Sequence, residues 1–515
     1  MNHITPEQAG ISSDAILQFI QLLEKKQLST HNLIFMKGNN VFFEKYWASF
    51  HKDFLHRMYS VSKSFVSIAV VFAEQDGFLS LDDKISKYFL EETKNLTDEN
   101  MLNQTIRHML MMSTAKPAEY WFDARTDDRV RFYFENKAEN SRPSGTVYEY
   151  DSPGSFVLCA LTERLTGKPF IEYLREKHFD KIGVSNGIHC LKCPGGHSWG
   201  DSAVLCTAED LLKVARFTMN KGRWNGEQIL NEKYISAAVS KQIDNNVWGV
   251  NDHDSQGYGY LFWRTYENSY FFNGMGCQYA VCVPDKDLIM VYNGDNQGKI
   301  MAKKIIFDGF FSMIADKISD TPLPEYKTAQ KNLKSAVSDL KLMEAKCACS
   351  SDYSEKINGV EYEMGKNPMG ITKMRVVLGT DSGRSEYTNA QGNKILNFGI
   401  GKNVFSKFPQ SGYSKDIGSV PSKGHLYDCA ASAAWIEPHK LFIKVQIIDE
   451  YFGNLNITLG FAENCTKLGV YMAKCAEDFL QEYEGFAGGI ANHPQSIDIR
   501  NPYGRIASAR KNIGI

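Results

Sequence analysis

The spacing of apolar residues predicts a helix followed by a hairpin near the start of the chain. Apolar positions within 16–23 fall on one helical face, and Ser12 or Ser13 suits the N-cap of that helix. Two β-prone runs, 33–36 and 41–46, then flank a Lys-Gly-Asn-Asn segment with the glycine and asparagines that tight turns favour. We therefore expect an antiparallel pair of strands directly after the first helix.

The middle of the N-terminal domain has a different pattern of apolar residues from its end. Residues 60 to about 240 have mostly helical patterns interrupted by polar loops. Short β-prone runs follow at 270–272, 279–283 and 288–292, the last two forming a predicted hairpin, and a helical face spans 305–314. This order favours an α+β fold, in which both ends of the domain build one antiparallel sheet and a helical lobe is inserted between them.

Thr321-Pro-Leu-Pro324 is the clearest domain boundary. We predict an N-terminal domain over 1–320 and a linker helix over 321–346. Repeated short β-prone runs with glycine-rich turns predict a small all-β barrel over 347–486. The polar tail, 487–515, is expected to be loosely ordered or bound to a neighbour.

Composition narrows the function classes. The chain has 515 residues, enough for at least two domains, and its formal net charge of −2 gives no reason to expect nucleic acid or an anionic membrane as a partner. No apolar run reaches the length of a membrane span, and the first 25 residues lack the pattern of a signal peptide. Eleven cysteines without a secretion signal indicate reduced thiols and a cytoplasmic protein, and homo-oligomerisation stays open.

One cluster has spacing that could suit zinc: His189, Cys190, Cys193 and His197. The Pro-Gly-Gly loop within it would permit the geometry, but a second cysteine pair at finger-like distance is absent. We therefore expect neither a metal nor a cofactor.

Candidate nucleophilic chemistry lies at Ser60 and Lys63. Residues three apart on a helix share a face, so the lysine amine can reach the serine oxygen, and the helix macrodipole favours a developing alkoxide at the N-terminus. Lysine acts as a base there only if desolvation lowers its pKa. Ser-x-x-Lys is weak evidence alone, because it occurs five times in the chain, but only Ser60 opens a long apolar helix. The other serines are Ser49, Ser113, Ser338 and Ser508.

Two further elements could meet that pair. Tyr150 and Ser152 lie two apart, so both point the same way in an extended loop, although Tyr150 could simply be an aromatic at a turn. Asn273 and Gly274 precede Met275, whose amide could form an oxyanion hole with the amide of Ser60. Taken alone, this glycine-rich segment could equally be a bulge or turn.

The segments around Ser60, Tyr150 and Met275, in this order along the chain, resemble the serine β-lactamase and penicillin-binding-protein superfamily. The resemblance is specifically to its class C β-lactamase-like branch of esterases, D-aminopeptidases and amide hydrolases. The resemblance covers roughly residues 5–318. It implies acylation of Ser60, with Lys63 and Tyr150 managing the proton, and deacylation by water or another acceptor. The C-terminal part is similar to lipocalin-like barrels attached to some of these hydrolases.

Two departures from the family pattern bear on the substrate. Ser152 stands where many relatives carry asparagine, and a hydroxyl there can bond Lys63 but cannot present an amide donor. Phe272-Asn273-Gly274 stands where β-lactamases have Lys-x-Gly and many esterases His-x-Gly. Without that cation we favour a small ester or amide over a penicillin, with acyl transfer or a silent ligand-binding or scaffold protein as alternatives.

Four aromatic residues could line the substrate entrance, although such residues more often belong to the core. They are Trp121, Phe122, Tyr133 and Trp199.

Overall fold

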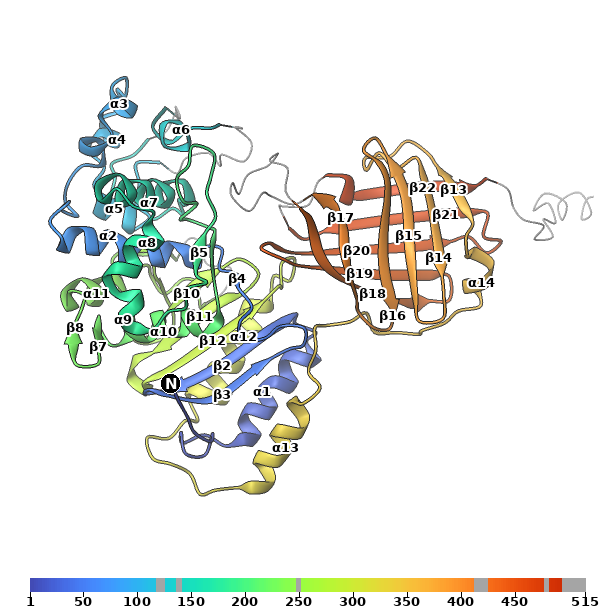
Figure 1. Ribbon diagram of the computed structural model, residues 1–515, viewed down its shortest axis with the longest axis horizontal. Helices are drawn as coiled ribbons and strands as arrows, with labels where there is room; N and C mark the ends of the chain where they lie inside the picture. Colours follow the sequence, from blue (N-terminus) through green and yellow to red (C-terminus); the bar gives the residue numbers. More distant parts are fainter. Residues whose placement is uncertain (117–125, 136–140, 247–251, 412–424, 477–480, 493–515) are drawn as a thin grey trace, which may run out of the picture. The chain divides into compact units, whose positions relative to one another are not determined.

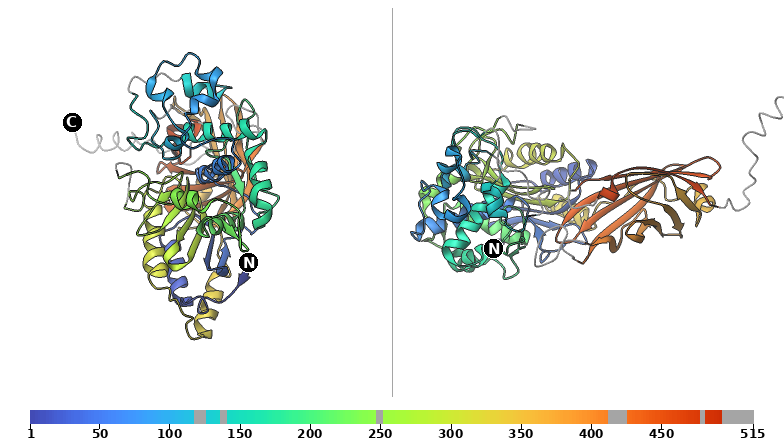
Figure 2. Two further views of the ribbon diagram at one scale, coloured as in Figure 1. Left: turned by 90° about the vertical axis from the view of Figure 1, so that its left-hand side faces the viewer. Right: turned by 90° about the horizontal axis from the view of Figure 1, so that it is seen from above.

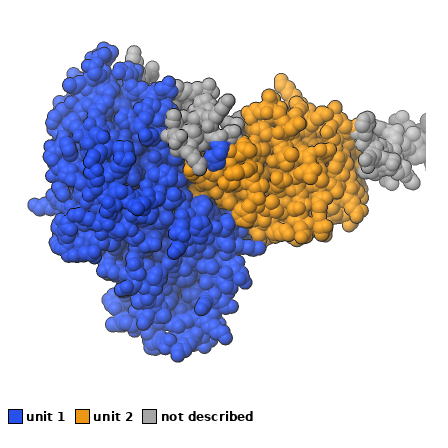
Figure 3. Space-filling model, viewed as in Figure 1, with its two compact units in different colours: residues 1–343, 413–425 blue, residues 344–412, 426–515 orange. Residues whose placement is uncertain are grey.

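The computed structural model describes residues 1–116, 126–135, 141–246, 252–411, 425–476 and 481–492. The chain forms two compact units, coloured separately in Figure 3. The first contains residues 1–343, and the second begins at Glu344. Each unit is described by itself below.

A seven-stranded sheet forms the centre of the first unit, in the order β1-β3-β2-β12-β11-β10-β9. Neighbouring strands are antiparallel apart from β1 and β3. β2 pairs with β12, so strands from both ends of the unit lie side by side, which confirms the predicted sheet. The strands are β1 (Asn2–His3), β2 (Thr30–Lys37), β3 (Asn40–Tyr46), β9 (Trp263–Arg264), β10 (Tyr270–Gly274), β11 (Gln278–Val283) and β12 (Leu288–Gly294).

Helices cover both faces of this sheet. On one face, the rings of Phe19 and Phe310, from α1 (Ser13–Lys25) and α12 (Ala302–Phe310), lie 6.0 and 6.1 Å from the ring of Phe35 in β2. The hydroxyl of Thr218 in α10 (Ala208–Met219) lies 2.9 Å from that of Tyr270 in β10. Ser12 caps α1 by accepting the amide of Ala15, as one of the two predicted caps. The sheet is therefore a buried platform.

Most of the remaining helices of the first unit group into a lobe beside the sheet, drawn from blue to green in Figures 1 and 2. They are α2 (Val61–Gln75), α3 (Leu90–Thr93), α4 (Glu99–Leu102), α5 (Ile106–Leu110), α6 (Arg129–Glu135), α7 (Ser152–Thr166), α8 (Phe170–Leu174), α9 (Asp180–Ile182) and α11 (Glu232–Ala238).

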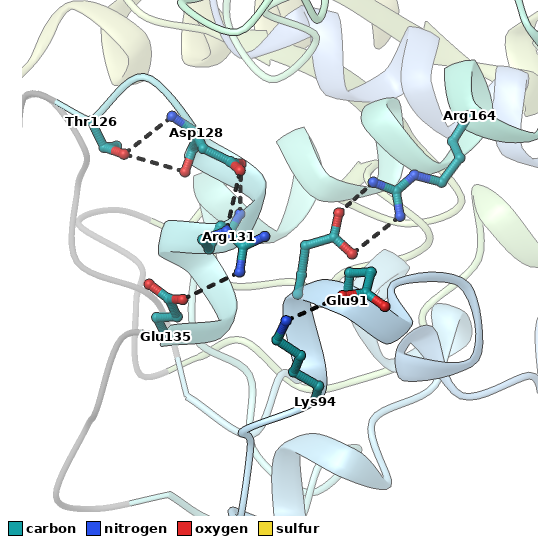
Figure 4. Close-up of polar contacts among 8 residues, drawn as sticks. Glu91, Lys94, Thr126, Asp128, Arg131, Glu135 and Arg164 are labelled. Atoms are coloured by element: carbon teal, nitrogen blue, oxygen red, sulfur yellow. Dashed lines mark hydrogen bonds and ion pairs between the residues drawn. The ribbon is translucent and has the colours of Figure 1, made fainter.

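Ion pairs link the surface helices of the lobe. Figure 4 shows Arg131 of α6 reaching Asp128 and Glu135, and Arg164 of α7 extending towards α3. Arg164 pairs there with Glu92 and lies over the ring of Phe89 at 4.3 Å. Pairs as exposed as those of Arg131 each contribute at most about 1 kcal/mol. The lobe is therefore stabilised mainly by its buried apolar side chains.

The helix α13 (Lys327–Val337) belongs to the first unit and runs beside α1 (Figure 1). It buries Ala329 and Leu333, and the side-chain amide of Gln330 donates to the carboxylate of Glu7 at 2.8 Å. The continuous N-terminal part of this first unit ends at Met343. None of the helices in the described ranges combines the length and apolar character needed to cross a membrane.

The second unit contains a closed barrel of nine described strands, which confirms the predicted all-β barrel (Figure 1). Its sheet closes because β16 also pairs with β18 in parallel, Gly399 opposite Ser432 and Ile400 opposite Ala433. In β21, Leu468, Val470 and Met472 are buried while their neighbours are not, the alternation of a strand with one face inside.

The barrel continues to Ala491, whereas the sequence suggested its end at residue 486. β17 pairs with β18 beside the nine-strand ring, and the short helix α14 (Tyr353–Ile357) precedes the first strand. The strands are β13 (Glu361–Met364), β14 (Lys373–Leu378), β15 (Ser382–Asn389), β16 (Gly392–Ile400), β17 (Val404–Ser411), β18 (Leu426–Glu437), β19 (Lys440–Ile448), β20 (Phe452–Phe461), β21 (Lys467–Lys474) and β22 (Gly485–Ala491).

Candidate active site

Ser60 stands at the N-terminus of the buried helix α2, as the sequence predicted. The chain reaches it through β4 (His56–Arg57), which pairs with β6 (Val204–Cys206) in the lobe. Tyr59, just before the serine, is buried with a φ of +46°, a left-handed conformation that costs energy in a residue with a side chain. The fold thus holds Ser60 on a strained turn between a strand and a helix.

Lys63 lies against the serine hydroxyl. Its Nζ donates to Ser60 Oγ at 3.0 Å and to the backbone carbonyl of Asp201 at 2.8 Å, and the residue is only 2% exposed. The Asp201 carboxylate is fully buried, and neither of its oxygens accepts a hydrogen bond from the described residues. Burial raises the pKa of Asp201, against the opposing charges of Lys63, Arg129 and Arg57. The lysine amine is therefore fixed by two acceptors in a buried, charged environment.

Tyr150 approaches the same lysine from the lobe. The Lys63 Nζ lies 5.0 Å from the centre of the Tyr150 ring, which lies 5.8 Å from the ring of Trp263. The next residue, Asp151, is buried and caps α7 by accepting the amide of Gly154 at 2.8 Å. This cap fixes the backbone that carries the tyrosine.

Ser152 does not lie in the extended loop that the sequence suggested. It is the first residue of α7, because Asp151 is the cap and Pro153 suits the first turn of a helix. Among the described residues its hydroxyl has no hydrogen-bond partner, and Lys63 bonds Ser60 and Asp201 instead. The expected contact between Ser152 and Lys63 is therefore not formed.

The third predicted element is a tight turn between β10 and β11. Asn273 and Gly274 end β10, Met275 follows, and the next two residues have φ values of +77° and +78°. A Cβ on Gly274 would lie 2.3 Å from the carbonyl oxygen of Met58, so only glycine allows this strand to approach the segment before Ser60. The turn and the nucleophile segment are thus packed backbone against backbone.

The buried side-chain amide of Gln278 supports this turn. Gln278 donates through Nε2 to the carbonyls of Met275 at 3.2 Å and Gly294 at 2.6 Å. Its Oε1 accepts the side-chain amide of Asn293 at 2.9 Å. The orientation of the Met275 peptide therefore depends on side chains from β11 and β12.

The three elements meet at one pocket of about 360 Å³. Of the predicted site residues, Ser60, Tyr150, Asn273, Gly274 and Met275 line it, while Lys63 lies behind Ser60 and Ser152 is not part of its wall. The remaining lining residues are Asp254, Trp263, Gly276, Cys277, Tyr279, Lys299, Ile300 and Lys303.

The charged members of this wall were not found from the sequence. Lys299 and Lys303 lie just beyond β12, outside the motifs, and Asp254 lies in the loop before β9. No local pattern distinguishes these residues from ordinary surface charges. The nearest available signal, for the two lysines alone, was that they come just before the helical face predicted at 305–314.

The residues of the zinc-like cluster have separate partners. His197 bonds Glu163 at 3.0 Å, His189 bonds the carbonyl of Gly187 at 2.9 Å, and Cys190 approaches the carbonyl of Leu191. The described residues contain no group of three or more side chains arranged to hold a metal. All eleven cysteines are described, and all are free thiols.

Two of the four aromatic candidates belong to the core. Tyr133 and Trp199 are buried, and Trp199 lies 4.8 and 4.9 Å from the guanidinium groups of Arg57 and Arg129. Trp121 and Phe122 lie outside the described residues.

Comparison with known proteins defines the class. The Beta-lactamase family profile matches residues 18–305, more than half of the chain, and the chain belongs to this family of β-lactamase-like hydrolases. The match confirms the resemblance seen in the motifs.

Individual relatives are distant. The 6-aminohexanoate-dimer hydrolase of Paenarthrobacter ureafaciens is 22% identical over 252 residues, which span 46% of this chain and 64% of that enzyme. An uncharacterised protein of Alkalihalophilus pseudofirmus is 22% identical over 269 residues, 47% of this chain and 74% of the other. A solved structure from Bacillus anthracis, assigned provisionally as a 6-aminohexanoate-dimer hydrolase, has the same fold, with a TM-score of 0.50 and 15% identity over 61% of this chain and 86% of that one.

Proposed function

We infer that this protein is a serine hydrolase that forms an acyl-enzyme on Ser60 and cleaves a small ester or amide. The observation that supports this most strongly is the 3.0 Å hydrogen bond from Lys63 Nζ to Ser60 Oγ. It lies at a pocket that Tyr150 and the Met275 turn also border. A nucleophile, a base and backbone donors around one cavity are what acyl transfer requires.

In the proposed reaction, Ser60 Oγ attacks the substrate carbonyl carbon while its proton passes to the amine nitrogen of Lys63, with Tyr150 beside it as a relay. The backbone amides of Ser60 and Met275 stabilise the oxyanion. The C–O or C–N bond to the leaving group then breaks, and the leaving group takes the proton. Water attacks the resulting ester, its proton returns through the same groups, and the free acid and Ser60 are released.

The pocket volume of about 360 Å³ lies at the lower end of the range for small-molecule sites, which supports a small substrate. The Paenarthrobacter relative is named as a hydrolase of the 6-aminohexanoate dimer, which supports testing amides alongside esters. Acyl transfer to an alcohol or amine would use the same acyl-enzyme, and product analysis with added methanol separates it from hydrolysis.

The proposal is tested by steady-state turnover of 4-nitrophenyl butyrate and its anilide. Replacing Ser60 by Ala should lower kcat/KM by about 10⁴-fold or more, as expected for loss of a nucleophile. Ser338→Ala is the matched control, because this exposed serine has the same Ser-x-x-Lys spacing but lies far along the chain from the pocket residues. Undiminished turnover in Ser60→Ala would contradict the mechanism.

A further inference from the structure

A second pocket of the first unit, here called the edge groove, lies between the strand β3 and the helix α13. Its volume is about 740 Å³, and no described residue lines both this groove and the proposed catalytic pocket. In the sheet, β2 and β12 separate β3 from β11, which borders the catalytic pocket. The edge groove is therefore a separate site, with a volume in the usual range for small-molecule ligands.

The floor of the edge groove is apolar because β3 contains a bulge. Phe43 lies opposite Phe35 of β2 and Val41 lies opposite Met36, so Phe42 is an extra residue between them. Bulges redirect side chains, and the rings of Phe42 and Phe43 both contact the Phe35 ring, at 5.6 and 6.0 Å. The floor consists of five buried apolar side chains: Val41, Phe42, Phe43, Phe50 and Leu333. None of them carries a hydrogen-bonding group, so the part of a ligand that lies on this floor must be apolar.

The groove is open because β3 is covered at only one end. The edge strand β1 is two residues long and pairs with Asn40 and Val41, and among the described residues no further strand lies beside 42–46. The facing wall is one side of α13, with residues spaced three or four apart: Gln330, Leu333, Lys334 and Val337. An apolar surface is thus left open at a sheet edge, where proteins usually provide a cover.

The rim of the edge groove is cationic. Three lysines line it and form no ion pair within the described part of the chain: Lys45, Lys52 and Lys334. The ammonium of Lys45 donates to the carbonyl of Ser338, just beyond the end of α13, at 3.4 Å. Among the described lining residues the only acid is Glu44, which accepts the hydroxyl of Tyr46 at 2.9 Å. The rim therefore has an excess of positive charge.

We propose that the edge groove binds a fatty acid, with the alkyl chain on the apolar floor and the carboxylate at the lysines of the rim. The floor alone would accept any apolar chain, and the excess of cations selects a chain with an anionic head group. An acidic peptide fits less well, because its backbone amides would need partners that the side chains of the floor do not provide. The groove is separate from Ser60, so this inference does not depend on the proposed acyl-enzyme.

Calorimetric titration of the full chain with decanoate tests this, with hexanoate and 1-decanol as matched ligands. We expect saturable binding of decanoate, at least about tenfold tighter than that of hexanoate, because each half-buried methylene contributes about twofold. 1-Decanol has a similar chain without the carboxylate and should bind about fivefold more weakly. High salt should reduce that difference, since the ion pair is partly exposed.

Two variants test whether the ligand lies in this groove. Val337→Trp fills the groove from the α13 wall and should abolish decanoate binding. The triple variant Lys45→Met, Lys52→Met and Lys334→Met should bind decanoate no more tightly than 1-decanol. Lys331→Met is the matched control, because this exposed lysine lies on the same helix but does not line the groove, and it should bind as the native protein does. A cooperative urea transition verifies that each variant is folded.

Three results would overturn the inference. One is a lack of saturable decanoate binding, whether or not an acidic peptide of alternating Glu and Val binds instead. Another is decanoate binding that survives in Val337→Trp, which would place the ligand elsewhere on the chain. The third is a preference for decanoate over 1-decanol that is absent from the native protein or persists in the triple variant, because the lysines would then have no role.

Discussion

Gly274→Ala is expected to disable the site while leaving the fold intact. The added Cβ would lie 2.3 Å from the carbonyl oxygen of Met58, whereas ordinary contact begins at 3.4 Å, so β10 and the segment before Ser60 must separate by about 1.1 Å. Met275 follows the mutated residue, and Ser60 lies two residues after Met58. The shift therefore separates the two amides proposed to stabilise the oxyanion.

A misplacement of about 1 Å at reacting groups costs roughly a hundredfold in rate, so kcat/KM for 4-nitrophenyl butyrate should fall by that factor. Overpacking of this kind also lowers the free energy of unfolding by about 1–3 kcal/mol, which urea denaturation measures. Gly187→Ala is the control, because its Cβ would meet its nearest neighbour, Leu55, at an ordinary 3.5 Å. Wild-type kcat/KM in Gly274→Ala would refute the argument that this backbone contact positions the site.

Three further changes have expected outcomes. Lys63→Met should lower kcat/KM by about 10³-fold, and Lys63→Arg should not restore it, because a guanidinium stays protonated; recovery in the arginine variant would exclude lysine as the base. Gln278→Met removes the brace under the Met275 peptide and should lower kcat about tenfold with little change in KM, whereas a change in KM alone would point to substrate binding instead. Burial lowers the pKa of His178 to about 3, so the unfolded chain binds more protons between pH 6.5 and 3 and stability falls as the pH falls through that window. His178→Phe should remove about 2 kcal/mol of the stability lost between pH 7 and 5 in urea titrations, and an unchanged pH dependence would contradict this.

The sheet and its helices could be predicted because their signals are local. The apolar spacing of 16–23 and the β-prone runs at 279–283 and 288–292 correspond to α1, β11 and β12. The barrel could be predicted as a class from its repeated strands and turns. Its closure could not, because the parallel pairing of β16 with β18 depends on residues about 30 positions apart.

The candidate site likewise has residues that local sequence signals identify and residues that they do not. Ser60 could be singled out because it opens an apolar helix, and Met275 because glycines surround it. Ser152 was misplaced in an extended loop, although Asp151 before it and Pro153 after it indicated the start of a helix. Lys299 could not be found, since only the course of the chain after β12 brings it to the pocket.

The sheet itself explains why the site forms where it does. β10 and β11 come from the end of the first unit, yet they meet the segment before Ser60 because β2 and β12 join the two ends of that unit in one sheet. The lobe then supplies Tyr150 through a backbone capped by Asp151. Each proposed catalytic group is thus positioned by buried elements, as acyl transfer requires.

The most direct test of the proposed acyl-enzyme is to locate the adduct formed by a fluorophosphonate. Trypsin cleaves after Arg57 and Lys63 and releases a peptide with two serines, Ser60 and Ser62. Ser62 is buried and accepts the amide of Val204 at 3.0 Å, so it is not available for reaction. The account predicts one adduct per chain, on Ser60, as fragmentation of this peptide by mass spectrometry would show. An adduct on another residue, or an unlabelled protein, would contradict it.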